Sequence, residues 1–260
     1  MAFLAVSPLF LKLNKMQMRE IVIGDIHSGL KALQALMLLV APSKKDRLIF
    51  LGDYVDGWSD AVATINYLEE LSTRCDCVFL KGNHDALTLD WLEHGLNNEQ
   101  WLAHGGAATV ASYAGQNQET ISRHMAFYKA LKPYYLDSKD RLFVHAGFSN
   151  QKGVGVEYFE KTFYWDRTLW ETALSLDPNL PPTSPLYPKR FKLYSEVFIG
   201  HTPLNRIGET QPVLKANIWN LDTAAAFRGP LSAMEINSKE VWQSKPVHQY
   251  YPLERGRNPV

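Results

Sequence analysis

The chain has 260 residues, of which 46% are hydrophobic and 21% charged, as is typical of a globular protein with one sizeable core. Its 27 basic and 27 acidic residues cancel, so no long-range field attracts it to nucleic acid or to an anionic membrane. We therefore expect neither as a partner, and any phosphate group must be recognised by a local site. Cys75 and Cys77 are too few for a disulfide framework and are expected to be reduced.

Residues 1–17 are interpreted as an extension of uncertain status. Most of residues 2–13 are apolar, but Pro8 interrupts them, and the run is shorter than the roughly 20 apolar residues that span a membrane. No cleavage site of small residues follows, and Met16 or Met18 could be the biological start. We expect a cytoplasmic protein.

Three short apolar segments in the first half of the chain predict β-strands that alternate with helices. The strands are expected at residues 20–23, 48–51 and 77–80, and the helices at residues 30–40, 61–71 and 87–92. This alternation indicates a partly parallel sheet flanked by helices. Such sheets place their chemistry beyond the carboxyl ends of the strands.

The pattern changes after residue 130. Residues 134–136 and 141–145 predict a β-hairpin, and further strands are expected at residues 197–200, 218–221 and 231–236. Because no long helix separates the last two, we expect a second, more antiparallel sheet packed against the first.

Two later segments lack a regular pattern. Residues 177–190 contain five prolines, which exclude a regular helix and a central strand. This segment is either a surface connection or a loop that shapes the entrance of a functional site. Residues 246–260 are polar and predict a C-terminal tail that wraps the surface or lacks a fixed structure.

Five segments place polar, chemically active side chains directly after predicted strands. They are Gly24-Asp25-Ile26-His27, Gly52-Asp53-Tyr54-Val55-Asp56, Gly82-Asn83-His84-Asp85, His145-Ala146-Gly147 and Gly200-His201-Thr202-Pro203. Each alone is weak, since a single Asp at a strand end usually caps the next helix. Carboxylate oxygens and imidazole nitrogens suit Mn²⁺, Fe and Zn²⁺. Together they predict a metal site, because a core has no use for so many Asp and His residues at strand ends.

In this order the five segments resemble the calcineurin-like metallophosphoesterase superfamily and, within it, the phosphoprotein phosphatase branch. The blocks of that branch run GDxHG, GDxxDRG, GNHE, HAG or HG, and a late His. The resemblance spans about residues 20–236 and is greatest for bacterial and phage Ser/Thr protein phosphatases and symmetrical diadenosine tetraphosphatases. It implies an α/β fold, a four-layer α/β/β/α sandwich of two mixed sheets flanked by helices, within one metallophosphoesterase domain at residues 18–245.

The resemblance also implies two divalent metal ions, with Mn²⁺ expected first and Fe or Zn²⁺ as alternatives. One ion would be held by Asp25, His27 and Asp53. The second would share Asp53 and add three further ligands, Asn83, His145 and His201. Two ions about 3.5–4 Å apart would clamp a phosphoryl oxygen, and a water bridging them would attack phosphorus as hydroxide.

His84 resembles the general acid of the family, which donates a proton to the leaving oxygen, and Asp56 would orient its imidazole. One departure concerns phosphate binding, because Gly57 stands where the family has an Arg, and glycine cannot supply a guanidinium fork. We predict that Arg167 makes the main phosphate contact and that Lys81 assists it.

Two substrates remain open. The first is a phosphate monoester of the Ser/Thr protein phosphatase type, and the second is symmetrical diadenosine tetraphosphate, split by the same site. The choice is expected to depend on residues 177–190 and 99–113. Pro203 stands where many phosphodiesterases of the superfamily have a further His, which favours the phosphatase branch. A catalytically inactive binding module is disfavoured because every ligand position is filled, and the sequence does not predict the oligomeric state.

Overall fold

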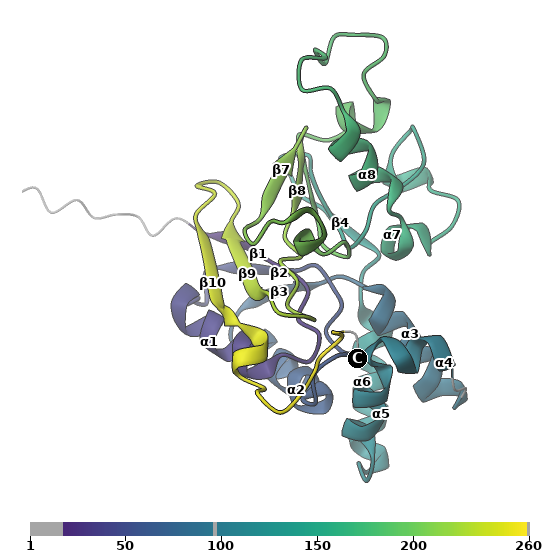
Figure 1. Ribbon diagram of the computed structural model, residues 1–260, viewed down its shortest axis with the longest axis vertical. Helices are drawn as coiled ribbons and strands as arrows, with labels where there is room; N and C mark the ends of the chain where they lie inside the picture. The colour runs from purple at the N-terminus through teal and green to yellow at the C-terminus, as the bar shows by residue number, and fades with distance from the viewer. Residues whose placement is uncertain (1–17, 96–97, 259–260) are drawn as a thin grey trace, which may run out of the picture.

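The computed structural model describes residues 18–95 and 98–258, so the expected extension at residues 1–17 lies outside the described residues. Two five-stranded sheets form the centre of the molecule (Figure 1). The first has the order β10-β9-β1-β2-β3 and consists of β1 (Glu20–Ile23), β2 (Arg47–Phe50), β3 (Asp76–Phe79), β9 (Pro230–Glu235) and β10 (Val241–Pro246). The second has the order β4-β5-β6-β8-β7 and consists of β4 (Tyr134–Leu136), β5 (Arg141–Val144), β6 (Glu196–Ile199), β7 (Val213–Lys215) and β8 (Ile218–Asn220).

Helices cover the outer faces of both sheets, which confirms the predicted four-layer α/β/β/α sandwich. Figure 1 shows α1 and α2 beside the first sheet and α7 and α8 beside the second. The helices are α1 (Leu30–Val40), α2 (Ala61–Ser72), α3 (Asn83–His94), α4 (Glu99–Trp101), α5 (Ala107–Tyr113), α6 (Gln118–Ala130), α7 (Thr162–Trp165) and α8 (Thr168–Ser175). Within residues 18–95 and 98–258, no helix has the length and apolar character needed to cross a membrane.

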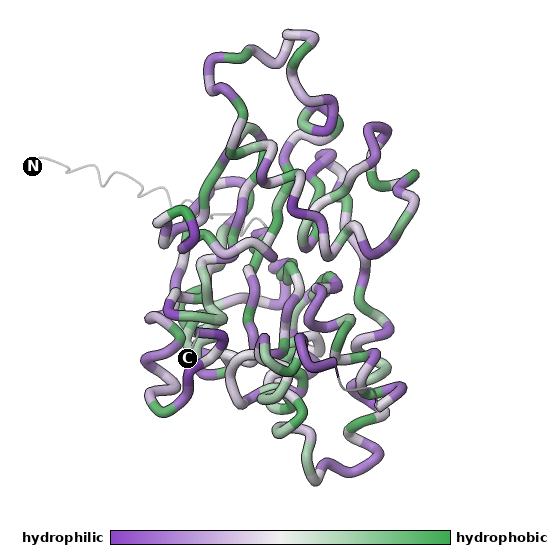
Figure 2. Tube along the Cα trace, turned by 45° about the vertical axis from the view of Figure 1, so that its right-hand side comes forward, coloured by the Kyte–Doolittle hydropathy of each residue, from purple (hydrophilic) through white to green (hydrophobic). Residues whose placement is uncertain are grey.

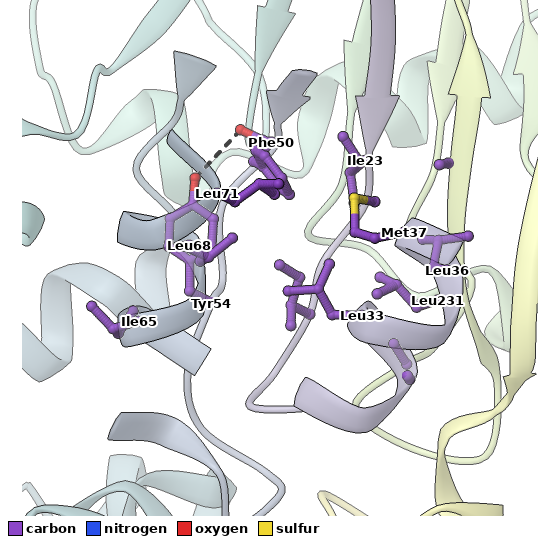
Figure 3. Close-up of a cluster of buried hydrophobic side chains, with 14 of the residues drawn as sticks. Ile23, Leu33, Leu36, Met37, Phe50, Tyr54, Ile65, Leu68, Leu71 and Leu231 are labelled. Atoms are coloured by element: carbon purple, nitrogen blue, oxygen red, sulfur yellow. Dashed lines mark hydrogen bonds between the residues drawn. The ribbon is translucent and has the colours of Figure 1, made fainter. Parts of the chain in front are cut away.

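The central strands are apolar throughout because both of their faces are buried. On β1, Ile21 and Ile23 pack into the cluster under α1 and α2, whereas Val22 points to the other side, against the second sheet. Figure 3 shows the cluster under the helices, where Ile23 of β1 and Phe50 of β2 lie among leucines of α1 and α2. Hydrophobic stretches therefore recur along both sheets and their helices, as the green segments of Figure 2 show.

The second sheet is not more antiparallel than the first, and this prediction was wrong. Strands β5, β6 and β8 run parallel to one another, as do β1, β2 and β3. The strand expected at residues 231–236 forms β9, which joins the first sheet by pairing antiparallel with β1. The two strands are about 200 residues apart, and local sequence patterns do not predict which distant strands pair. The result is a pair of parallel three-stranded cores packed face to face.

The C-terminal segment wraps the surface of the domain, which was one of the two alternatives expected for it. Strand β10 runs to Pro246, and the chain then buries Val247 and Tyr251 against the first sheet and α1. The Tyr251 ring stacks on Trp58, with 5.2 Å between ring centroids. This packing could not be predicted from the sequence, because the two apolar residues that it buries stand among many polar ones.

Asp46, in the loop before β2, is expected to make stability depend on acid. Burial alone would raise its pKa, but hydrogen bonds from Arg19 and Ser43 lower the pKa of Asp46 to about 2. The stabilisation is therefore complete above the unfolded pKa of about 4 and is lost as the pH falls towards 2. We expect Asp46→Asn to lower the free energy of unfolding by about 1–2 kcal/mol at pH 7.

Urea unfolding of the wild-type and variant proteins at pH 7 and pH 3 checks this expectation. The difference between them should shrink at pH 3, while the control Asp90→Asn, at an exposed carboxylate on α3, should match the wild type at both pH values. A difference that is the same at both pH values would contradict the expectation.

Candidate metal centre and active site

The predicted ligands come together where the two parallel cores meet. The loops that follow β1, β2, β3, β5 and β6 all leave the carboxyl ends of parallel strands, which lie at one edge of each sheet. Backbone bonds tie these loops to one another: Ile26 and His27 both donate their N–H to the carbonyl oxygen of Asp53. Segments that are far apart in the sequence thus present their side chains to one site.

Asp53 lies between two groups of potential ligands. Its Oδ2 atom is 3.6 Å from Nε2 of His27 on one side and 3.4 Å from Nε2 of His145 on the other. Ligand atoms of His27, Asp53 and His84 lie within 4.8 Å of one another, and so do those of Asp53, His145 and His201. A carboxylate shared by two groups of donors is the arrangement that two neighbouring metal ions require.

Asn83 belongs to the second of these groups. Its Oδ1 atom lies 3.2 Å from Nε2 of His145 and 2.8 Å from Nδ1 of His201. The amide oxygen thus points to the same place as the two imidazoles. These distances bring together five of the six predicted ligands, namely His27, Asp53, Asn83, His145 and His201. The sixth, Asp25, is outside both groups, although it is buried beside them and contacts the backbone of His201.

Two buried atoms at the site have no hydrogen-bond partner among the described residues. They are Oδ1 of Asp25 and Nε2 of His201. The other carboxylate oxygen of Asp25 accepts a hydrogen bond of 2.9 Å from the backbone N–H of His201. Buried polar atoms are nearly always paired, and a lone oxygen and a lone imidazole nitrogen are both good metal donors. The residues present therefore fit two divalent ions.

Neighbouring carbonyls fix the orientation of two of the imidazoles. Nδ1 of His145 lies 2.8 Å from the carbonyl oxygen of Leu51, and Nδ1 of His27 lies 3.1 Å from that of Asp56. A carbonyl can only accept, so these contacts assign the ring proton to Nδ1 and leave Nε2 as the donor atom. This is the tautomer that a metal ligand needs.

The buried charges at the site are poorly balanced without a cation. Burial and the nearby carboxylate of Asp222 raise the pKa of Asp25 well above its usual range. Burial lowers the pKa of His27 and of His201, which disfavours imidazolium at both positions. His145 differs, because burial would lower its pKa but the carboxylate of Asp53 outweighs this and raises it to about 10. The two neutral imidazoles of His27 and His201 beside clustered carboxylates belong to a donor set suited to metal ions.

Four residues of the site have strained backbone conformations. His27, Asp53, Asp56 and His201 all have positive φ angles, of 52°, 52°, 69° and 65°. Such conformations cost free energy in residues other than glycine and gather at functional sites. Gly200 is required for a different reason, because a Cβ atom there would lie 1.9 Å from Oδ1 of Asp25.

His84 lies at the edge of the ligand groups and is held by Asp56. Its Nδ1 atom is 2.6 Å from Oδ2 of Asp56, which is fully buried. Trp101 donates its indole N–H to the same oxygen at 2.5 Å, and the hydroxyl of Thr109 donates to the other oxygen at 2.6 Å. Asp56 is therefore fixed and in turn fixes the imidazole of His84.

Asn83 and His84 are the first two residues of helix α3, which begins four residues before the helix expected at residues 87–92. The carboxylate of Asp85 caps this helix by accepting the N–H of Gly82 at 2.8 Å. The same carboxylate accepts the N–H groups of Asp53 and Tyr54, at 2.8 and 2.9 Å. Asp85 thus supports the loop after β2 and the start of α3 through backbone hydrogen bonds.

A pocket of about 320 Å³ opens over the site. Asp53, Asn83, His84 and His201 form its floor. Its walls carry three arginines, Arg167, Arg206 and Arg257, and three aromatic residues, Trp101, Trp165 and Phe227. The pocket therefore combines candidate metal ligands, the imidazole of His84 and positive charge.

Of the two predicted phosphate-binding residues, Arg167 lies in the pocket and Lys81 lies outside it. Arg167 lines the pocket, with its Nη1 atom 3.5 Å from the hydroxyl of Thr202. Lys81 lines a separate hollow and forms an ion pair of 2.7 Å with Glu160. We therefore do not retain Lys81 as a phosphate contact, because its charge is already matched elsewhere.

Residues 177–190 do not line the pocket, so the interpretation as a surface connection holds for this segment. Gln100, Trp101 and His104 do line it, as expected for residues 99–113. Arg206 and Arg257 were missed by the sequence analysis. Nothing in the local sequence distinguishes them from exposed basic residues.

Comparison with known proteins agrees with this geometry. The family model described as "Calcineurin-like phosphoesterase" matches residues 18–225. The chain is 24% identical to the bis(5'-nucleosyl)-tetraphosphatase PrpE [asymmetrical] of Oceanobacillus iheyensis, over 84% of this chain and 89% of that protein. It is 32% identical to serine/threonine-protein phosphatase 2 of Escherichia coli, over 47% of this chain and 55% of that protein.

The fold is also found among solved structures. A protein serine/threonine phosphatase from Saccharomyces cerevisiae with similarity to human phosphatase PP5 superposes with a TM-score of 0.56 at 13% identity. The match covers 88% of this chain and 80% of that one. The chain belongs to the calcineurin-like phosphoesterase family, and it is a metallophosphoesterase.

Proposed function

We propose that the chain hydrolyses phosphate monoesters of the Ser/Thr protein phosphatase type, with His84 as the general acid. The observation that carries this proposal is the position of His84. Its imidazole is fixed by Asp56 at 2.6 Å and lines the same pocket as Asp53, Asn83 and His201. A proton donor thus lies beside the place where a phosphoryl group would meet the metal donors.

Two divalent ions held by the six ligands would lower the pKa of a water molecule and neutralise charge on the phosphoryl group. The chain's own residues supply the rest. Arg167 would bind the phosphoryl oxygens through its guanidinium fork. His84 would give a proton to the leaving oxygen, and Asp56 would stabilise the imidazolium form that carries this proton.

A second candidate is the hydrolysis of a dinucleoside polyphosphate by the same groups. Three observations favour it. Three arginines line one pocket, which suits a chain of several phosphates, and the Oceanobacillus relative is named as a tetraphosphatase. The aromatic walls at Trp101, Trp165 and Phe227 would also suit a nucleobase.

Turnover of both substrates by one preparation distinguishes these candidates. Metal-stripped protein restored with Mn²⁺ would be given a phosphoserine/phosphothreonine peptide and diadenosine tetraphosphate side by side, with His84→Ala as control. Release of phosphate from the peptide that depends on metal and on His84 would support the phosphatase proposal.

Turnover of the dinucleotide alone would replace that proposal with the second candidate. The products then define the cleavage, since two ADP molecules indicate symmetrical cleavage and ATP with AMP indicates asymmetrical cleavage. Turnover of neither substrate would overturn both candidates.

A further inference from the structure

Arg257, near the C-terminus, lies against the position where the family resemblance expects an arginine that this chain lacks. Gly57 occupies that position, and a Cβ atom built on Gly57 would lie 3.5 Å from Cγ of Arg257. A Cβ atom on Gly105, whose carbonyl oxygen accepts the N–H of Gly57, would lie 3.1 Å from the same Cγ. Two glycines thus leave room for the side chain of Arg257 to pass into the pocket.

The segment that carries Arg257 is firmly attached to the domain. In Figure 1 this yellow segment leaves β10 and returns across the molecule. The hydroxyl of Tyr251 donates to Asp60 at 2.6 Å, and Ser59 donates both its N–H and its hydroxyl to the carboxylate of Glu254, at 2.9 and 2.8 Å. The backbone N–H of Arg257 then donates to the carbonyl oxygen of Ala226 at 2.8 Å. The path of the chain therefore directs this side chain to the pocket.

Arg257 forms no ion pair among the described residues, and the charge of the buried Asp222 carboxylate acts on it only from a greater distance. Its guanidinium lies 5.4 Å from the ring centroid of Phe227, and its buried Nε atom has no hydrogen-bond partner among the described residues. Within residues 18–95 and 98–258, neither Arg257 nor Arg167 nor Arg206 forms an ion pair with a carboxylate, although other arginines such as Arg19 and Arg141 do. Buried charged groups are usually paired, so an unpaired guanidinium in a pocket is available to an anionic ligand.

The charges of Arg206 and Arg257 act on Arg167. Burial and next the charge of Arg206 lower the pKa of Arg167, Glu171 opposes this, and Arg257 lowers the pKa further. Like charges held close together in a half-buried pocket are unfavourable unless an anion joins them. The pocket is therefore arranged to receive an anion, and the neighbouring metal donors point to a phosphate group.

We propose that Arg257 is a phosphate-binding residue that replaces the arginine missing at Gly57, so that the C-terminal segment completes the substrate site. This inference rests on the proposed function, since the phosphate it binds is that of the substrate. A guanidinium can bind two phosphate oxygens in parallel, which a backbone glycine cannot do. The positive charge that relatives carry at position 57 is then supplied by the C-terminal segment.

The test uses the full chain loaded with Mn²⁺ and three variants. Arg257→Ala removes the charge, Arg257→Lys keeps the charge without the fork, and Arg255→Ala is the matched control, an exposed arginine outside this pocket. Two quantities are measured: the affinity for inorganic phosphate by titration calorimetry, and KM and kcat for p-nitrophenyl phosphate. Thermal unfolding shows whether each variant is folded.

We expect Arg257→Ala to weaken phosphate binding and raise KM by about 10- to 100-fold. Arg257→Lys should recover part of this loss, and Arg255→Ala should match the wild type. Phosphate affinity and KM of Arg257→Ala within twofold of the wild type would overturn the inference. If Arg257→Ala does not fold, Arg257→Lys decides: unchanged affinity overturns the inference and weaker binding supports it.

Phosphate binding separates this inference from the proposed function. A wild-type protein that binds phosphate through Arg257 without hydrolysing a monoester would contradict only the function. A protein that hydrolyses the monoester equally well with or without Arg257 would contradict only the inference.

Discussion

Replacing Asp53 by alanine is expected to remove metal from both positions and to lower turnover by on the order of 10³-fold or more. Among residues 18–95 and 98–258, Asp53 is the one carboxylate that belongs to both ligand groups, with Oδ2 3.6 Å from Nε2 of His27 and 3.4 Å from Nε2 of His145. Metal ions supply several kcal/mol of transition-state stabilisation, and each 1.36 kcal/mol is a factor of ten in rate. Loss of the shared ligand should therefore abolish most of the activity.

The measurements are metal content per chain after gel filtration and kcat for p-nitrophenyl phosphate. Asp90→Asn, at an exposed carboxylate on α3, should keep the metal content and activity of the wild type. Full metal content in a folded Asp53→Ala protein would show that the two groups of donors do not share this carboxylate.

Replacing His84 by alanine is expected to lower kcat by about 10²- to 10⁴-fold for a phosphoserine substrate, the range that general acid catalysis provides. The loss should be smaller for p-nitrophenyl phosphate, because nitrophenolate leaves without being protonated. A dependence on the leaving group is the specific property of a proton donor. A residue that only holds the fold would affect both substrates equally.

Metal content decides between two roles for His84. Its ring lies close to His27, with 5.1 Å between centroids, and one of its nitrogens lies within ligand distance of the first group. We expect His84→Ala to keep the metal content of the wild type, and His94→Ala, on the exposed end of α3, to keep full activity as well. Loss of metal from His84→Ala would make His84 a ligand instead of the acid.

Much of the fold followed from the sequence because the central strands are short, apolar and closed by glycine. Residues 20–23 form β1 as predicted, and the other two strands of the parallel core are displaced by one residue. The partner of β9 could not be predicted, because its pairing with β1 depends on contacts between opposite ends of the chain. The local pattern of apolar residues predicts which residues are buried, but it does not predict which sheet a strand joins.

The ligands were predictable for a related reason. Asp25, Asp53 and Asn83 follow strands whose carboxyl ends must meet, so their order along the chain implied their proximity. Arg257 has no such relation to a strand. It reaches the pocket only because Tyr251 and Glu254 attach the C-terminal segment to the residues around Trp58, a contact that no sequence spacing indicates.

Metal-dependent hydrolysis at the site around Asp53 is tested most directly by a metal titration. Protein stripped by a chelator would be given increasing Mn²⁺ while turnover of p-nitrophenyl phosphate and bound metal are followed together. The account predicts no turnover in the stripped protein and full recovery when about two ions per chain have bound. Turnover that persists without metal, or protein that binds no Mn²⁺, would contradict it.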